Sequence, residues 1–142
     1  PDRFPVFNIR GPLGHYYGFP EYGIPGVKVG KYHHLSEVVD PDGVERETGP
    51  ADESPIRAFM KSVLPGAAGA TLKTKVCLFT NTPDEHFIVD RLPGTGRVVV
   101  GAGYSGHGFK FASVMGEVLA GLATGEKASD DAAFLSLARF AS

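Results

Sequence analysis

The fold of this chain is decided by one stretch, Arg97-Val98-Val99-Val100-Gly101-Ala102-Gly103-Tyr104-Ser105-Gly106-His107-Gly108. Its apolar run is typical of a short buried strand in a parallel sheet, and the glycines that follow predict a tight turn. Apolar residues at helical spacing come next, which predicts a helix beginning near His107. These residues are Phe111, Val114, Met115, Val118, Leu119 and Leu122. The stretch therefore predicts one β-α unit.

The glycines of this turn match a dinucleotide-binding fingerprint by letter, as Gly101-x-Gly103-x-x-Gly106. A complete unit also needs a second parallel strand after the helix, with an acidic residue near its end. Residues 123–131 are polar and turn-like, and residues 132–140 look helical, so that strand is missing. The free N–H groups at the helix start would still suit an anionic ligand atom. An ordinary strand-to-helix turn explains the spacing equally well.

Two basic residues, His107 and Lys110, fall in the first turn of the predicted helix. A cation there opposes the helix dipole, so Lys110 needs a compensating partner or a functional reason. The alternative is a surface lysine that extends into water.

Outward from this unit, the first half of the chain reads as β-structure. Short strands at residues 4–9, 15–19 and 27–33, separated by Gly/Pro turns, predict an antiparallel meander. Ser54-Pro55 predicts a helix start, and Pro65-Gly66 predicts its end. Further strands are expected at residues 72–80 and 86–90, and a terminal helix at residues 130–139. The fold class is therefore α+β, a β-rich half followed by one β-α unit.

Composition limits the function classes. The 142 residues make about one domain, and a net charge of -2 provides no electrostatic footprint for nucleic acid. No apolar run long enough to cross a membrane and no signal-peptide pattern is present, and a single cysteine fits the reducing cytoplasm. The chain begins at Pro1 without an initiator methionine, which suggests a fragment or a processed product.

The single cysteine, Cys77, lies in an apolar run that ends in a turn signal. It is either a small core residue or a nucleophile kept for chemistry. Nearby, Asp84-Glu85-His86 is too compact for metal ligation and reads as turn chemistry between two strands. His33 and His34 would point to opposite faces of a strand, which argues against joint metal binding. We therefore predict no metal site.

Three segments carry a resemblance, namely residues 77–87, residues 103–111, and residues 16–20 together with 27–30. Together they resemble one family, that of monomeric sarcosine oxidase and the N-methyl amino acid oxidases. The run from Cys77 to Phe87 resembles the flavin-attachment segment of that family. Residues 103–111 resemble a second signature, and residues 16–20 with 27–30 resemble a third. The order and spacing of the segments agree too, so the likeness extends over essentially the whole chain.

The resemblance implies an FAD-dependent amine oxidoreductase, a flavoprotein of which this chain is the C-terminal portion. Residues 1–76 would be part of the substrate domain, with antiparallel strands plus one helix. Residues 77–142 would be the C-terminal portion of the FAD-binding domain. The family's N-terminal half, which holds the ADP moiety of FAD, has no counterpart in the chain.

The resemblance also implies roles for individual residues. The match at Cys77 implies covalent flavin, through a thioether to the 8α-methyl carbon. Lys110 matches a lysine that helps to bind the substrate carboxylate, and Lys28 matches a lysine near flavin N5 that is associated with oxygen activation. Tyr17 and His107 match residues that line the site. The expected cofactor-binding residues are Cys77, Gly106, His107, Gly108, Phe109 and Lys110.

Some positions depart from the family pattern or have a plainer explanation. His33 is a weaker match because Lys31 is an extra residue before it, and Phe79 replaces a tyrosine found in some members. On pattern alone, Lys28 is a solvent-facing strand residue and Tyr17 an ordinary strand aromatic.

The expected function is oxidation of a small secondary amino acid, N-methyl or cyclic, with O₂ as acceptor, producing an imine and hydrogen peroxide. The alternative is a stand-alone, non-catalytic domain that keeps the fold and binds no flavin. For the chain by itself we expect no bound FAD, no activity, and self-association through apolar surface left exposed without the other half.

Overall fold

The computed structural model describes residues 4–141. The chain divides into two compact units, Pro1–Cys77 and Leu78–Ser142, each of which combines antiparallel strands with an α-helix. The predicted α+β class is confirmed.

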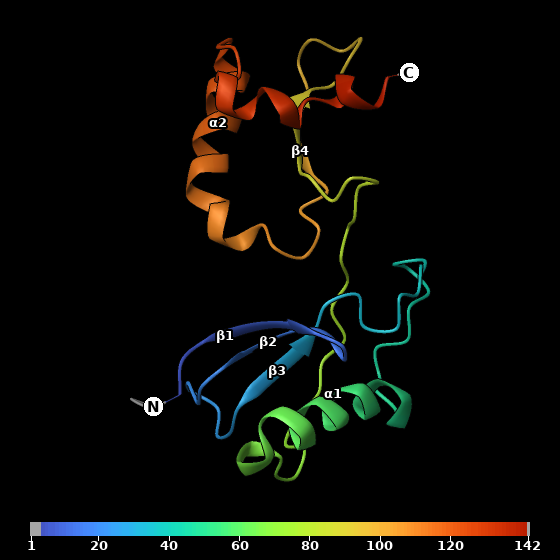
Figure 1. Ribbon diagram of the computed structural model, residues 1–142. Helices are drawn as coiled ribbons and strands as arrows, with labels where there is room; N and C mark the ends of the chain where they lie inside the picture. The colour runs from blue at the N-terminus through green and yellow to red at the C-terminus, as the bar shows by residue number, and fades with distance from the viewer. Residues whose placement is uncertain (1–3, 142) are drawn as a thin grey trace. The chain divides into compact units, whose positions relative to one another are not determined.

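The first unit is built on the predicted antiparallel meander (Figure 1). Its strands are β1 (Phe7–Gly11), β2 (Gly14–Phe19) and β3 (Lys28–Lys31), in that order across the sheet. Each pair is antiparallel, with Phe7 opposite Gly18 and Phe19 opposite Lys28. The first strand begins later than the sequence predicts, and the third is shorter.

One helix, α1 (Pro50–Val63), covers one face of this sheet (Figure 1). Phe59 and Met60 are buried against Tyr16 of β2, and the Phe59 and Tyr16 rings stack 4.0 Å apart. The Tyr16 hydroxyl lies 3.1 Å from the Leu13 carbonyl and 3.2 Å from the Pro55 carbonyl. Burial of these aromatic rings holds the helix on the sheet.

The predicted start of this helix at Ser54-Pro55 is wrong. The helix begins at Pro50, where the Gly49 carbonyl accepts the N–H groups of Asp52 and Glu53. The Asp52 carboxylate accepts the Gly49 N–H at 2.9 Å, which satisfies a donor that a helix start leaves unpaired. Pro55 therefore lies inside the helix, without the N–H that would continue the bonding pattern. The predicted end holds, because a 3-10 turn, η1 (Pro65–Ala67), follows.

The predicted strand at residues 72–80 is also wrong, since the structure has no regular element there. A strand needs a neighbour to pair its backbone groups, and β4 and β5 pair only with each other. Leu72 is 66% exposed and Leu78 38% exposed, so burial supplies no driving force for a strand either.

The second unit contains a hairpin of β4 (Ile88–Arg91) and β5 (Val99–Ala102). The two strands are antiparallel, so the parallel-sheet reading of Arg97–Val100 is wrong. Their connection is short and is closed by a hydrogen bond of 2.8 Å from the Leu92 N–H to the Val98 carbonyl. Parallel neighbours would need a crossover of about a dozen residues or more.

The helix after the glycine turn begins later than the sequence predicts. A 3-10 turn, η2 (Phe109–Phe111), leads into α2 (Ala112–Thr124), so His107 and Lys110 precede α2. The helix packs on the hairpin (Figure 1). Its Leu122 side chain joins Phe87 and Val89 in the core of this unit. No strand follows α2 in the described part of the chain, so the full dinucleotide-binding unit is absent there.

The predicted terminal helix is two short 3-10 helices, η3 (Asp130–Leu135) and η4 (Leu137–Phe140). Ser136 separates them in an extended conformation, since its hydroxyl and the Leu137 N–H both bond the Asp90 carboxylate, at 2.6 and 2.8 Å. No helix among the described residues is long and apolar enough to cross a membrane.

Candidate active site

A polar and aromatic face lies on the side of the β1-β2-β3 sheet away from α1. Side chains alternate along a strand, so His15, Tyr17 and Phe19 lie opposite the buried Tyr16. In the register of the sheet, Phe19 is opposite Lys28, and Tyr17 is opposite Gly30. We call this surface the aromatic face.

Tyr17 and Lys28 lie on the aromatic face, and both contact Phe19. The Lys28 ammonium lies 5.6 Å from the centre of the Phe19 ring, within the range of a cation–π contact. The Tyr17 ring is 6.3 Å from Phe19 and 5.1 Å from Tyr32. Lys28 is exposed, so its charge faces open space on this surface.

Gly30 gives Tyr17 its place on this face. The Tyr17 ring lies across β3 directly over Gly30, and a Cβ at that position would overlap the ring. Only glycine leaves the ring in this position without a shift of one of the two strands.

Cys77 is exposed, so the core interpretation of this residue is wrong for this chain. It is also free of any disulfide. Burial raises the pKa of the Tyr17 hydroxyl, and the neighbouring Cys77 and Tyr32 raise that pKa further. The Tyr17 hydroxyl therefore stays protonated at neutral pH and is able to donate a hydrogen bond.

The face also contains residues that sequence reasoning missed. The His15 ring stacks on Tyr32 at 4.3 Å and bonds the Asn8 side chain. Burial lowers the pKa of His15, as do Arg10 and His33, so its ring is neutral near pH 7. The alternation of His15, Tyr17 and Phe19 along β2 is the signal that could have found this histidine.

In the second unit, the glycine turn accommodates the chain just after Cys77. Gly103 and Gly106 have positive φ angles of 62° and 73°. A Cβ on Gly103 would overlap Thr82, and one on Gly106 would overlap the Phe79 ring. We call residues 78–84 the post-cysteine segment; it is packed against this turn.

The predicted residues of the glycine turn differ in their surroundings. The His107 ring packs 5.0 Å from Phe87, while Phe109 is 96% exposed. The Lys110 ammonium donates to the His107 carbonyl at 2.9 Å and lies 4.8 Å from the centre of the Phe111 ring. These two contacts offset the unfavourable interaction of the Lys110 charge with the positive end of the α2 dipole. Gly108 packs closely against the Tyr104 ring.

The Asp84-Glu85-His86 sequence forms a turn, as predicted. The Asp84 carboxylate accepts the His86 N–H at 3.1 Å, and the Glu85 N–H bonds the Thr82 carbonyl at 3.1 Å. Among the described residues, no group of three or more His, Cys, Asp and Glu side chains could hold a metal ion.

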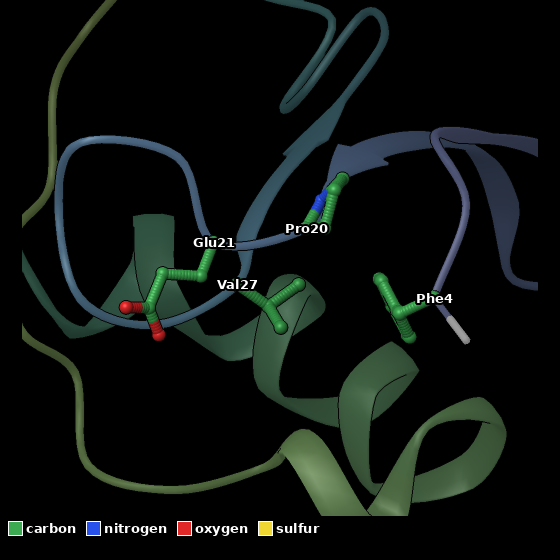
Figure 2. A pocket seen from close by; sticks show the side chains of 4 residues that line it. All are labelled: Phe4, Pro20, Glu21 and Val27. Carbon is green, nitrogen blue, oxygen red and sulfur yellow. The ribbon is translucent and has the colours of Figure 1, made fainter. Parts of the chain in front are cut away.

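One pocket lies in the first unit. Figure 2 shows its lining, in which Pro20 and Val27 lie between Phe4 and Glu21. None of the predicted site residues lines it.

The chain belongs to the FAD dependent oxidoreductase family, whose model matches residues 1–122. It is 47% identical over 139 residues to a monomeric sarcosine oxidase of Bacillus sp. (strain NS-129). It is also 41% identical over 143 residues to an N-methyl-L-tryptophan oxidase of Salmonella typhi.

These alignments include 96% and 98% of this chain, and 36% and 37% of the respective relatives. The chain therefore spans about a third of the length of the curated relatives that it matches. The predicted resemblance to the sarcosine oxidase and N-methyl amino acid oxidase family is confirmed.

Proposed function

We propose that this chain is the C-terminal portion of a flavin-dependent oxidase of secondary amino acids, N-methyl or cyclic. The observation that carries the proposal is an exposed, unpaired thiol at Cys77, beside Tyr17, in a chain 47% identical to a sarcosine oxidase. The products would be an imine and hydrogen peroxide, with O₂ accepting two electrons and two protons from the amine.

The residues present fit a covalently held FAD. The sulfur of Cys77 is accessible and makes no disulfide, so it is free to form a thioether. A bond between the Cys77 sulfur and the flavin 8α-methyl carbon would release one hydrogen from each partner, and O₂ would accept the corresponding two electrons and two protons. FAD, when bound, supplies the two-electron redox chemistry, and the protein supplies orientation and charge.

The aromatic face and the glycine turn would supply these functions. Lys28 would present a positive charge where negative charge develops as O₂ is reduced. The protonated Tyr17 hydroxyl would orient the substrate by donating a hydrogen bond. Lys110 would leave its contact with the His107 carbonyl to bind the substrate carboxylate. His107 and the neighbouring residues Gly106, Gly108 and Phe109 would line the cofactor.

We assign the two units to different domains of the oxidase. Residues 1–76 would belong to the substrate domain and residues 77–142 to the FAD-binding domain, a boundary one residue before the one that separates the two units. The part that holds the ADP moiety of FAD would come from residues outside this chain. Unlike the two units described, that part would contain a complete glycine fingerprint.

The test uses the complete gene product that contains this chain. We expect a yellow protein whose colour stays with the polypeptide after acid precipitation, and which forms hydrogen peroxide from N-methyl amino acids. Colour released to the supernatant would contradict the covalent bond, and absence of flavin would favour the non-catalytic alternative. The 142-residue chain alone is the control, for which we expect little FAD binding and no peroxide.

Gly30→Ala in the complete protein is expected to lower kcat/KM about tenfold. The new methyl group displaces the Tyr17 ring, and a loss of about 1.4 kcal/mol in transition-state binding corresponds to that factor. Steady-state kinetics with an N-methyl amino acid measure it. Gly43→Ala is the matched control, because nothing lies within 4 Å of a Cβ at that turn position. Equal values of kcat/KM for the two variants would contradict the proposed role of Tyr17 in orienting the substrate.

A further inference from the structure

One arginine near the end of the chain, Arg139, bonds the turn that closes the post-cysteine segment. Its Nε donates to Asp84 Oδ2 at 2.7 Å, and its Nη2 lies 3.2 Å from Asp84 Oδ1. This is a two-point contact between guanidinium and carboxylate, the geometry that makes arginine pairs strong and directional. We call this ion pair the Arg139 clasp.

The clasp is held firmly on the arginine side. Nη1 of Arg139 donates to the carbonyls of Leu135 and Ser136 at 2.9 and 3.0 Å. Nη2 also donates to the His86 carbonyl at 2.9 Å. The side chain is only 17% exposed. With its donors satisfied and its position set, the guanidinium gives up little further conformational freedom when it binds Asp84.

The clasp is equally well supported on the aspartate side. Asp84 Oδ1 accepts the His86 N–H and lies 3.0 Å from the hydroxyl of Thr82. The hydrogen bond from Arg139 is the largest of the effects that hold the pKa of Asp84 well below its usual range. The carboxylate therefore stays ionised, and it ties Thr82 and His86 to the arginine.

From Thr82 the contacts continue along the post-cysteine segment to the glycine turn. Thr82 is buried, and its methyl group packs where Gly103 lacks a side chain. The Ser105 N–H donates to the Thr80 carbonyl at 3.1 Å. The Phe79 ring lies over Gly106. The segment is thus fixed to the turn from Phe79 to Thr82 and closed by the clasp at Asp84.

We propose that Arg139 and Asp84 are positioning residues for covalent attachment of the cofactor at Cys77. Cys77 lies two residues before Phe79, so covalent geometry keeps its Cα within about 7 Å of the docked residue. Formation of the thioether requires the sulfur to be held close to its target in a suitable orientation. By closing the post-cysteine segment on the glycine turn, the clasp restricts where the thiol lies. This inference rests on the proposed covalent flavin.

The experiment compares three variants of the complete gene product: Arg139→Gln, Arg139→Lys and Asp90→Asn. Arg139→Gln removes the clasp, and Arg139→Lys keeps the charge but not the two-point geometry. Asp90→Asn is the matched control, because Asp90 holds the same C-terminal segment through Ser136 and Leu137 without touching the post-cysteine segment. Asp84→Asn is the second test of the clasp should Arg139→Gln fail to fold, because it keeps the acceptor for the His86 N–H.

The first measured quantity is the fraction of flavin that stays with the polypeptide after acid denaturation. We expect it to fall about tenfold in Arg139→Gln at early times of reconstitution, to recover in part in Arg139→Lys, and to stay near the wild-type value in Asp90→Asn. The second is hydrogen exchange of the Ser105 N–H, which should speed up in Arg139→Gln alone.

A wild-type level of attachment in Arg139→Gln would overturn the positioning role while leaving the proposed function intact. Equal losses of attachment in Arg139→Gln and Asp90→Asn, at equal loss of thermal stability, would overturn it too, because stability alone would then explain the effect. A wild-type protein without covalent flavin would overturn the covalent part of the proposed function, and the attachment role with it.

Discussion

Cys77→Ala in the complete gene product is expected to abolish covalent flavin attachment. Cys77 is the only cysteine of this chain, and its thiol is exposed beside Tyr17. Alanine removes the nucleophilic sulfur without adding bulk, so non-covalent binding of FAD should persist in a weaker form. The measurement is the flavin absorbance of protein that has been precipitated with acid and redissolved, which should fall from about one flavin per chain to background.

Two controls make this result specific. Cys77→Ser keeps the size of the side chain, and its hydroxyl should be as ineffective as alanine because an alcohol is a far weaker nucleophile than a thiol at neutral pH. Reconstitution with an excess of FAD should restore some peroxide formation, which would show that the fold is intact. Covalent flavin that persists in Cys77→Ala would place the attachment at another residue and remove the main support for the proposal.

Lys28→Met is expected to slow the reaction of the reduced enzyme with O₂ by about 100- to 1,000-fold. Loss of one preorganised group that stabilises developing negative charge typically costs a factor of this size. Methionine keeps an apolar side chain of similar length but has no charge, so the substitution removes the positive charge and, with it, the cation–π contact with Phe19. The measurement is rapid mixing of substrate-reduced protein with buffer of known O₂ concentration.

Measuring flavin reduction and flavin reoxidation separately distinguishes this effect from a general loss of activity. Anaerobic reduction by the amino acid should change little in Lys28→Met, because the charge is needed when electrons leave for O₂. Lys28→Arg keeps the charge and should retain most of the O₂ reactivity. Unchanged O₂ reactivity in Lys28→Met would contradict the proposed role, as would equal slowing of flavin reduction and reoxidation. Lys28 would then be an ordinary solvent-facing strand residue.

Local patterns predicted the elements that depend on neighbours in sequence. The meander follows from alternation and Gly/Pro turns, and the end of α1 follows from Pro65-Gly66. The start of α1 was missed because Ser54-Pro55 carries the same letters as a true cap. The true start at Pro50 is set by the hydrogen bond from the Gly49 N–H to the Asp52 carboxylate. That bond depends on how the preceding loop approaches the helix.

The candidate site was likewise predicted in part from the sequence, while the rest depended on the fold. The family motifs indicated Tyr17, Lys28 and Cys77 as separate positions along the chain. That Tyr17 and Lys28 share a face depends on the register of β2 and β3, and the exposure of Cys77 depends on how the chain around it folds. His15 was missed, since its importance lies in stacking on Tyr32, seventeen residues further along the chain.

By itself, the sequence determined the α+β class and the family, because strand alternation, turn glycines and short motifs are written in consecutive residues. Only the tertiary structure decided that β5 pairs antiparallel with β4, that residues 72–80 form no strand, and that Arg139 closes the turn at Asp84. The Arg139–Asp84 ion pair joins residues 55 positions apart in the sequence, and the packing of the unit brings them together. The pairing of β5 with β4 depends on how the turn between these two nearby strands closes, which the apolar residues of either strand do not encode. A strand at residues 72–80 would need a neighbouring strand to pair with, and its own residues cannot provide one.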